Sequence, residues 1–146
     1  MTRYYDIDEA NAAIPEVERI LLALRDQRAD LIRLRDMVVA GSQGAVDGGR
    51  ADDGARTDGP GATATADART LRLRMQGLID QMQAGVGQLV ERDVMLREIE
   101  TGLIDFPALA NGRQVWLCWR LGEGPVAWWH ELSDGFGGRR QLIDLT

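Results

Sequence analysis

The sequence predicts an α+β fold: a long antiparallel helical hairpin, coiled-coil-like, packed by a small C-terminal antiparallel β-meander. Two long segments, 8–40 and 67–101, repeat apolar residues at helical spacing. The segment between them is rich in Gly and Ala, and residues 102–146 alternate apolar and polar side chains between turn-forming residues. At 146 residues, the chain has the length of one domain, which we expect over residues 1–146.

The first helical segment begins near Asp6 or Asp8, either of which can cap a short helical turn over residues 8–13. Pro15 then suits the first position of a new helix, where its missing N–H costs no hydrogen bond. An apolar stripe continues to about residue 40 and contains Val17, Ile20, Leu21, Leu24, Leu31, Leu34 and Val38. This stripe predicts a long amphipathic helix.

Residues 41–66 differ in composition from the helical segments on either side. Half of them are Gly or Ala, and they contain no aromatic residue, Leu or Ile. A segment with so little to bury does not recover the entropy lost on ordering. We therefore expect a flexible, acidic Gly/Ala loop.

Helical periodicity returns from about residue 67 and predicts a second helix as far as residue 101, where Gly102 can end it. The apolar positions follow steps of four and three: Leu71, Met75, Leu78, Met82, Leu89, Leu96 and Ile99. A second stripe of Ile79, Val86 and Val90 offers a surface for a homodimer.

Three strands are predicted after Gly102, in LIDFPAL, QVWLCWR and VAWWHEL. The first two are joined by an Asn111-Gly112 turn, and the next two by a turn over residues 122–125. A Gly-rich loop, SDGFGGRR, leads to a fourth candidate strand over residues 141–145.

Turn chemistry predicts the register of these strands. The first turn pairs Phe106 with Leu117 and Asp105 with Cys118. A four-residue second turn pairs Trp119 with Trp128 and Leu117 with His130. One face then carries Ile104, Phe106, Val115, Leu117, Trp119, Val126, Trp128, His130 and Leu132, and lies on the helices. The other carries Asp105, Trp116, Cys118, Arg120, Trp129 and Glu131. A one-residue slip would instead place Cys118 across from His130.

Composition narrows the function classes. The net charge is −6 and all seventeen basic residues are arginine. This charge argues against nucleic acids and anionic membrane surfaces as partners, and the absence of lysine excludes a lysine nucleophile. A single cysteine cannot form an intramolecular disulfide. The chain starts without a signal-peptide core, and no run approaches the ~18 apolar residues of a membrane span. We expect a cytoplasmic protein.

Several uncommon sequence motifs resemble those of a bacterial family, the "domain of unknown function 2203". They are GLIDFPA, VWLCWRLGE, WWH and GFGGRR, together with the opening DIDEANAAIPEVERIL. The likeness covers the chain outside residues 41–66. It implies a small soluble bacterial protein with an α-helical hairpin and no established activity, and it transfers no residue role.

All four tryptophans, the only cysteine and the only histidine lie within residues 116–130. Tryptophan and arginine are enriched at interface hot spots, so we expect a recognition surface on the outer sheet face, formed by Trp116, Arg120, Trp129 and Glu131. Arg139 and Arg140 of the Gly-rich loop can add an anion-binding element. The function expected is non-catalytic binding or assembly, with an unknown protein or a second copy as partner. Alternatively, residues 141–145 and the loop cover the tryptophans as a second small core.

A rival hypothesis is a metal or haem protein centred on Cys118 and His130. The ligands could be Cys118 with Asp105 and Glu131, or His130 with a carboxylate such as Glu98 or Glu100. Zinc, iron or haem is the group to consider. The sequence contains no CxxC or HxxxH pair, so no cofactor is expected. A thiol enzyme ranks third, because the preferred register places Cys118 and His130 on opposite faces. We therefore expect no catalytic residues and no enzymatic activity.

Overall fold

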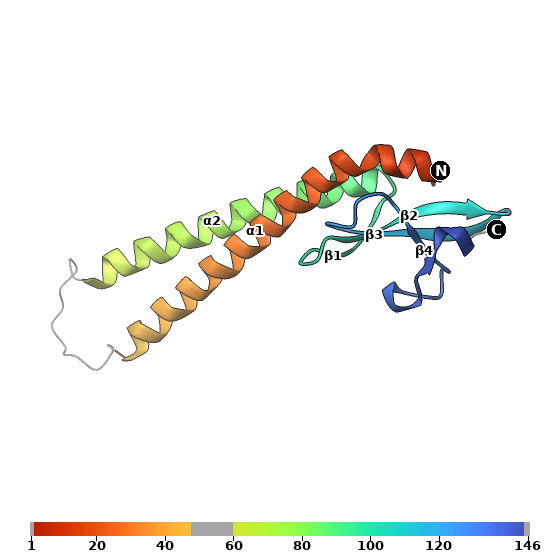
Figure 1. The fold of residues 1–146 in the computed structure, drawn as a ribbon. Helices are drawn as coiled ribbons and strands as arrows, with labels where there is room; N and C mark the ends of the chain where they lie inside the picture. Colours follow the sequence, from red (N-terminus) through yellow and green to blue (C-terminus); the bar gives the residue numbers. More distant parts are fainter. Residues whose placement is uncertain (1, 48–59, 145–146) are drawn as a thin grey trace. The chain divides into compact units, whose positions relative to one another are not determined.

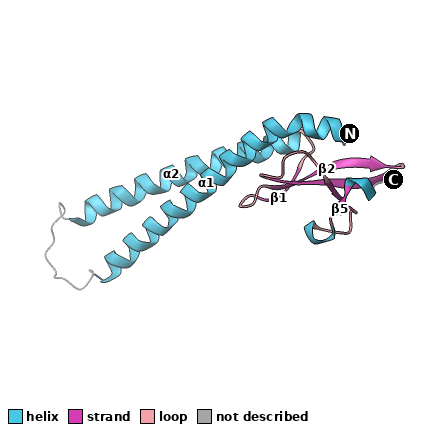
Figure 2. Cartoon of the chain, in the orientation of Figure 1, coloured by secondary structure: helices cyan, strands magenta, loops and turns pink. Residues whose placement is uncertain are grey.

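The computed structural model describes residues 2–47 and 60–144 (Figure 1). Its elements confirm the α+β class, with two long helices and a five-stranded antiparallel sheet (Figure 2). The helices are α1 (Ile7–Asp47) and α2 (Pro60–Glu91), and two 3₁₀ turns are η1 (Phe136–Gly138) and η2 (Leu142–Asp144). The strands are β1 (Met95–Glu98), β2 (Leu103–Ala110), β3 (Arg113–Arg120), β4 (Trp128–His130) and β5 (Arg140–Gln141).

The chain divides into two compact units. The first combines Met1–Asp26 with Gln83–Thr146 and contains the sheet, and the second is Gln27–Met82. Within the described residues, every buried apolar side chain belongs to the first unit. Those on the helices include Ala10, Val17, Ile20, Leu21, Leu24 and Leu89. None of the described helices has the length and apolar character needed to cross a membrane.

Helix α1 begins with a capping box. The Asp6 carboxylate accepts a hydrogen bond from the Glu9 backbone N–H at 2.7 Å, and the Glu9 carboxylate accepts one from the Asp6 N–H at 3.4 Å. This confirms Asp6 as the cap. The prediction of two helices divided at Pro15 is wrong, because α1 continues through this proline. Pro15 removes only the backbone bond to the Asn11 carbonyl, and the rest of the helix is retained.

Helix α2 ends at Glu91, ten residues before the predicted end at residue 101. Asp93 turns the chain with a φ of 57°, and the N–H of Val94 donates to the Leu89 carbonyl at 3.0 Å. The backbone then forms β1, so Leu96 belongs to a strand and pairs with Ile104. The helical spacing of Leu96 was coincidental, because a four-residue strand is too short to show its own period.

The predicted loop over residues 41–66 is shorter in the structure, since α1 extends to Asp47 and α2 starts at Pro60. Residues 41–47 and 60–66 of the predicted loop are helical, and residues 48–59 lie outside the described residues.

The strands follow the order β1-β2-β3-β4-β5. Between β2 and β3 the predicted register is confirmed, with Phe106 opposite Leu117 and Asp105 opposite Cys118. Asn111 and Gly112 have φ values of 53° and 78°, as a two-residue type I′ turn requires.

Between β3 and β4 the predicted register is wrong by one residue. Leu117 lies opposite Trp129, and Cys118 opposite Trp128. The connection is a longer loop rather than a four-residue turn, and hydrogen bonds to other parts of the unit fix it. The Trp119 indole donates to the Gly124 carbonyl at 2.7 Å, and Asn11 of α1 accepts from the Val126 N–H at 2.7 Å.

This one-residue difference exchanges the faces of the β4 side chains. The face that packs on Tyr5 carries Ile104, Phe106, Ala108, Val115, Leu117, Trp119 and Trp129, all buried. The Tyr5 and Phe106 ring centroids are 5.0 Å apart there. Trp128 and His130, which were expected on this face, lie on the opposite one with Asp105 and Cys118.

Candidate metal centre

Asp105, Cys118 and His130 meet on one face of the sheet, on the neighbouring strands β2, β3 and β4. Asp105 pairs directly with Cys118, and His130 pairs with Trp116, two residues along β3 from the cysteine. None of the three is more than 2% exposed, and their ligand atoms all lie within 4.8 Å of one another. The expectation that Cys118 and His130 lie on opposite faces is therefore wrong.

Hydrogen bonds orient the histidine. The Nδ1 of His130 is 2.9 Å from the Glu131 carbonyl oxygen, which can only accept, so Nδ1 carries a proton and donates. The Nε2 atom faces Oδ1 of Asp105 at 3.0 Å. Two lone pairs do not attract, so one proton lies between these atoms.

Arg97 of β1 orients the carboxylate from its other side. Its Nε donates to Oδ2 of Asp105 at 2.8 Å, and its guanidinium carbon lies 5.1 Å from the centre of the Trp116 ring. Asp105 Oδ1 and His130 Nε2 therefore face each other inside the cluster. The second polar atom of each side chain, Oδ2 or Nδ1, forms a hydrogen bond with a residue outside the cluster. Metal-binding histidines and carboxylates in proteins have outer hydrogen bonds of this kind.

Cys118 is protonated at neutral pH. Burial raises the pKa of its thiol to about 12, and the negative charge and hydrogen bond of Asp105 act in the same direction against a weaker opposing effect of Arg139. Within the described residues both ring nitrogens of His130 bond elsewhere, to Glu131 and Asp105. The geometry therefore does not form the thiolate–imidazole pair that a thiol enzyme needs.

The separation of one donor pair, Asp105 Oδ1 and His130 Nε2, is close to that in a tetrahedral metal site. Nitrogen and oxygen ligands lie about 2.0–2.1 Å from zinc, so two of them at the tetrahedral angle are about 3.3 Å apart. The observed separation of Asp105 Oδ1 and His130 Nε2 is 3.0 Å. A small outward shift would accommodate an ion in place of the proton between them.

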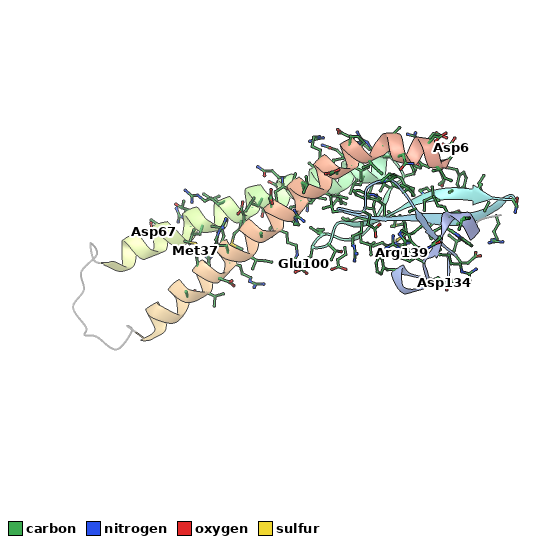
Figure 3. All side chains as sticks on the ribbon, viewed as in Figure 1. Asp6, Met37, Asp67, Glu100, Asp134 and Arg139 are labelled. Carbon is green, nitrogen blue, oxygen red and sulfur yellow. The ribbon has the colours of Figure 1, made fainter. Side chains whose placement is uncertain are left out.

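Arg139 lies in the segment between η1 and β5 (Figure 3). Its two terminal nitrogens donate to the Glu123 carboxylate at 2.6 and 2.8 Å. The guanidinium also lies 4.6 Å from the ring centre of Trp128 and 4.5 Å from that of Phe136. Burial raises the pKa of Glu123, but the hydrogen bonds and charges of Arg139 and Arg120 more than offset it, so this pKa is lowered.

The predicted recognition surface is not assembled on one face. Trp116 is half-buried beneath Arg97, whereas Trp129 is 3% exposed on the opposite face and donates its indole N–H to the Gln141 carbonyl at 3.1 Å. The C-terminal segment thus contacts Trp129, whereas Trp116 contacts Arg97 of β1. The alternative, that residues 141–145 and the loop cover the outer tryptophans, therefore agrees with the structure at Trp129 only.

The other predicted binding residues are dispersed. Arg120 is exposed 5.0 Å from the Phe136 ring, and Arg140 lies 5.3 Å from the Trp129 ring. Glu131 pairs with Arg113, and Arg139 with Glu123. The two arginines of the Gly-rich loop therefore have different partners, Arg139 with Glu123 and Arg140 with Trp129, and do not form one anion-binding site.

Sequence reasoning missed Arg97 and Glu123. Arg97 was assigned to a helix, and only recognition of the β1 edge strand would have placed it beside Asp105. It also missed a cavity of about 380 Å³ within the first unit. Its lining is Thr2, Val86, Leu89, Val90, Asp93, Val94, Met95, Leu96, Pro107, Gln114 and Trp116.

The fold and site define a small α+β protein with a buried Asp/Cys/His cluster beneath an arginine. The family described as "Uncharacterized conserved protein (DUF2203)" matches residues 3–142. This match spans nearly the whole chain, so the protein belongs to that family, as the resemblance of its motifs implied. Searches of curated proteins and of solved structures find no match.

Proposed function

We propose that this protein binds one divalent transition-metal ion through Sγ of Cys118, Nε2 of His130 and Oδ1 of Asp105. The observation that carries the proposal is the buried convergence of these three donors, within 4.8 Å, on adjacent strands. The outer bonds of Asp105 to Arg97 and of His130 to Glu131 support it, because they preset the ligand atoms.

The donor set favours Zn²⁺. Thiolate and imidazole are ligands of zinc and of other later transition metals, whereas Mg²⁺ and Ca²⁺ require oxygen donors. The three residues are at most 2% exposed. Three protein donors leave the fourth position of a tetrahedral ion for water or another ligand. We also propose a reducing, cytoplasmic setting, in which a lone thiol remains available as a ligand.

Binding must displace protons. The metal replaces the thiol proton of Cys118 and the proton between His130 and Asp105, while the Arg97 hydrogen bond to Oδ2 is retained. The favourable coordination energy must exceed the cost of ionising a thiol whose pKa is about 12.

The direct test is the metal content of the full chain, purified without chelators or a His-tag, followed by titration with Zn²⁺ and Co²⁺. We expect stoichiometric binding and, with Co²⁺, a thiolate-to-cobalt charge-transfer band. Cys118→Ser, His130→Ala and Asp105→Asn should each lose the band and most of the affinity. Glu98→Gln, which changes an exposed carboxylate of β1, is the matched control and should bind normally. A wild-type chain that binds neither ion contradicts the proposal.

A second candidate function is non-catalytic binding at the cavity beside Trp116. The observation that favours it is the exposure of apolar side chains around this cavity, with Val90 64% and Met95 43% exposed. An apolar small molecule or partner side chain, including one from a second copy, fits this lining. Trp116→Ala and Val90→Asp should then abolish concentration-dependent association or dye binding that Leu109→Asp, at another exposed site, leaves intact.

A further inference from the structure

The Asp105–Cys118–His130 cluster lies beside a segment with few buried contacts of its own. Residues 133–141 contain η1 and the two-residue strand β5, and η1 has no buried residue. Strand β5 pairs with β4 through Gln141 opposite Trp128 and Arg140 opposite Trp129. Segments with so little buried apolar surface open locally at a small fraction of the global unfolding free energy.

Arg139 connects this segment to Trp128 of β4 and to Glu123 in the loop between β3 and β4. Its side chain is 11% exposed, it forms two hydrogen bonds with Glu123, and it is stacked between Trp128 and Phe136. Trp128 is the direct partner of Cys118 in the β3/β4 pairing. Arg139 therefore lies at the boundary between the covering segment and the cysteine.

The charge of Arg139 also affects the pKa of Cys118 in the cluster. The positive charge lowers the thiol pKa of Cys118, against the larger effects of burial and Asp105. Burial lowers the pKa of Arg139, but the hydrogen bond and charge of Glu123 and the nearby Asp105 carboxylate more than offset it, so this pKa is raised. This mutual influence agrees with the position of Arg139 inferred from its contacts.

We propose that residues 133–141 form a gate over the Asp105–Cys118–His130 cluster, with the Arg139–Glu123 pair as its latch. Opening of the gate sets the rate at which a metal ion or a small reagent reaches Cys118. The role in metal entry rests on the proposed function, whereas the gate itself can be tested on the thiol alone.

The first experiment measures the rate at which N-ethylmaleimide labels Cys118 in the metal-free full chain. Cys118 is the only cysteine, so mass spectrometry reports its labelling without interference. Arg139→Gln and Glu123→Gln should each accelerate labelling about tenfold or more, and the double variant should be no faster than the faster single variant. Arg140→Gln removes the adjacent arginine, which stacks on Trp129, and should change the rate less than about twofold.

Arg139→Gln also changes the intrinsic reactivity of the Cys118 thiol, and this change opposes the expected acceleration of labelling. Loss of a positive charge that lowers the Cys118 pKa makes the thiolate rarer and slows its intrinsic reaction. Faster labelling then reports greater access. Unchanged or slower labelling in both latch variants overturns the proposal.

Global unfolding is separated from gating by low concentrations of urea. Local opening exposes little surface, so the labelling rate of the latch variants should be nearly independent of urea below the unfolding transition. A rate that rises with the slope of global unfolding overturns the gate. With Co²⁺, the latch variants should show faster uptake and faster release and a smaller change in affinity. Failure of wild-type protein to bind metal refutes the proposed function alone, because the labelling comparison still decides the gate.

Discussion

Asp105 contacts every other member of the candidate site. It lies on β2, accepts a hydrogen bond from Arg97 of β1, pairs with Cys118 of β3 and bonds to His130 of β4. A carboxylate that is 2% exposed requires such partners, because an unpaired buried charge costs several kcal/mol. These contacts make the residue both a candidate ligand and a constraint on the sheet.

The raised pKa of Cys118 predicts a loss of stability in alkali. Above pH 9 the thiol ionises in the unfolded chain but not in the folded one, where its pKa is about 12. The unfolded state then binds fewer protons, so the free energy of unfolding falls as pH rises from 9 towards 12. Urea unfolding between pH 8 and 11 should show this decline, with a smaller slope in Cys118→Ala.

Part of the alkaline slope should persist in that variant. Burial is the main cause that raises the pKa of Tyr5, which therefore contributes in the same direction. Equal slopes in wild type and Cys118→Ala would contradict the assignment of a strongly raised pKa to the cysteine.

The same thiol predicts the pH dependence of metal affinity. Cys118 remains protonated in the metal-free protein between pH 6 and 8, so binding releases at least its proton. The apparent association constant for Zn²⁺ should rise about tenfold per pH unit for each proton released. Competition with a chelator of known affinity at several pH values measures this slope, and an affinity that is independent of pH would contradict thiolate ligation.

At the scale of elements, turn chemistry made the β2/β3 hairpin predictable. The Asn111-Gly112 turn adopts the positive φ angles that its residue types favour, and this sets every pair between the two strands. The start of α1 was predictable for a similar reason, because the Asp6–Glu9 capping box is local in sequence.

The β3/β4 register and the end of α2 depend on interactions that are remote in sequence. Asn11 holds the backbone of Val126, 115 residues away, and Tyr5 donates its hydroxyl to the Arg92 carbonyl at the end of α2. Periodicity contains no information about such bonds. The sequence therefore identifies Cys118, His130 and Asp105 as candidate ligands by residue type. The predicted β3/β4 register, however, places His130 on the opposite face of the sheet from the other two.

The turn between β1 and β2 offers a test of backbone strain with a matched control. Gly102 has a φ of +68°, and a Cβ there would lie 2.4 Å from Cδ1 and 2.5 Å from Cγ of Leu121. Gly112 has a φ of +78°, and a Cβ added to it would meet nothing within 4 Å. Gly112→Ala should lose about 1 kcal/mol from the unfavourable φ alone. Gly102→Ala should lose roughly 2–4 kcal/mol, because the clash adds to the strain.

Urea unfolding of the two variants under identical conditions measures this difference. Equal losses would show that Leu121 moves aside without cost, and would argue against close packing at this turn.

At the scale of the whole molecule, the buried apolar side chains and the candidate centre belong to the same compact unit. Met1–Asp26 and Gln83–Thr146 contain all of them within the described residues, whereas Gln27–Met82 has half-buried and exposed side chains only. The two helices are neighbours near the boundary, since Gly85 of α2 approaches Leu24 of α1. A short connection can therefore join them there.

This division predicts that the first unit folds without the second. A chain in which Gln27–Met82 is replaced by a short Gly/Ser turn should retain cooperative unfolding, the protection of Cys118 from alkylation and the proposed metal affinity. Circular dichroism, thiol labelling and Zn²⁺ titration check these properties. A disordered product would instead show that the sheet depends on Gln27–Met82.

Asp105 also has a consequence for how the chain reaches its native pairing. In a sheet whose β4 strand has slipped by one residue, His130 would turn to the other face and the carboxylate would lose one of its two side-chain donors. Such a mispaired sheet buries similar apolar side chains, so hydrophobicity discriminates against it only weakly. The hydrogen-bonding demand of one buried acid thus adds to the free-energy difference between the native register and this one-residue slip.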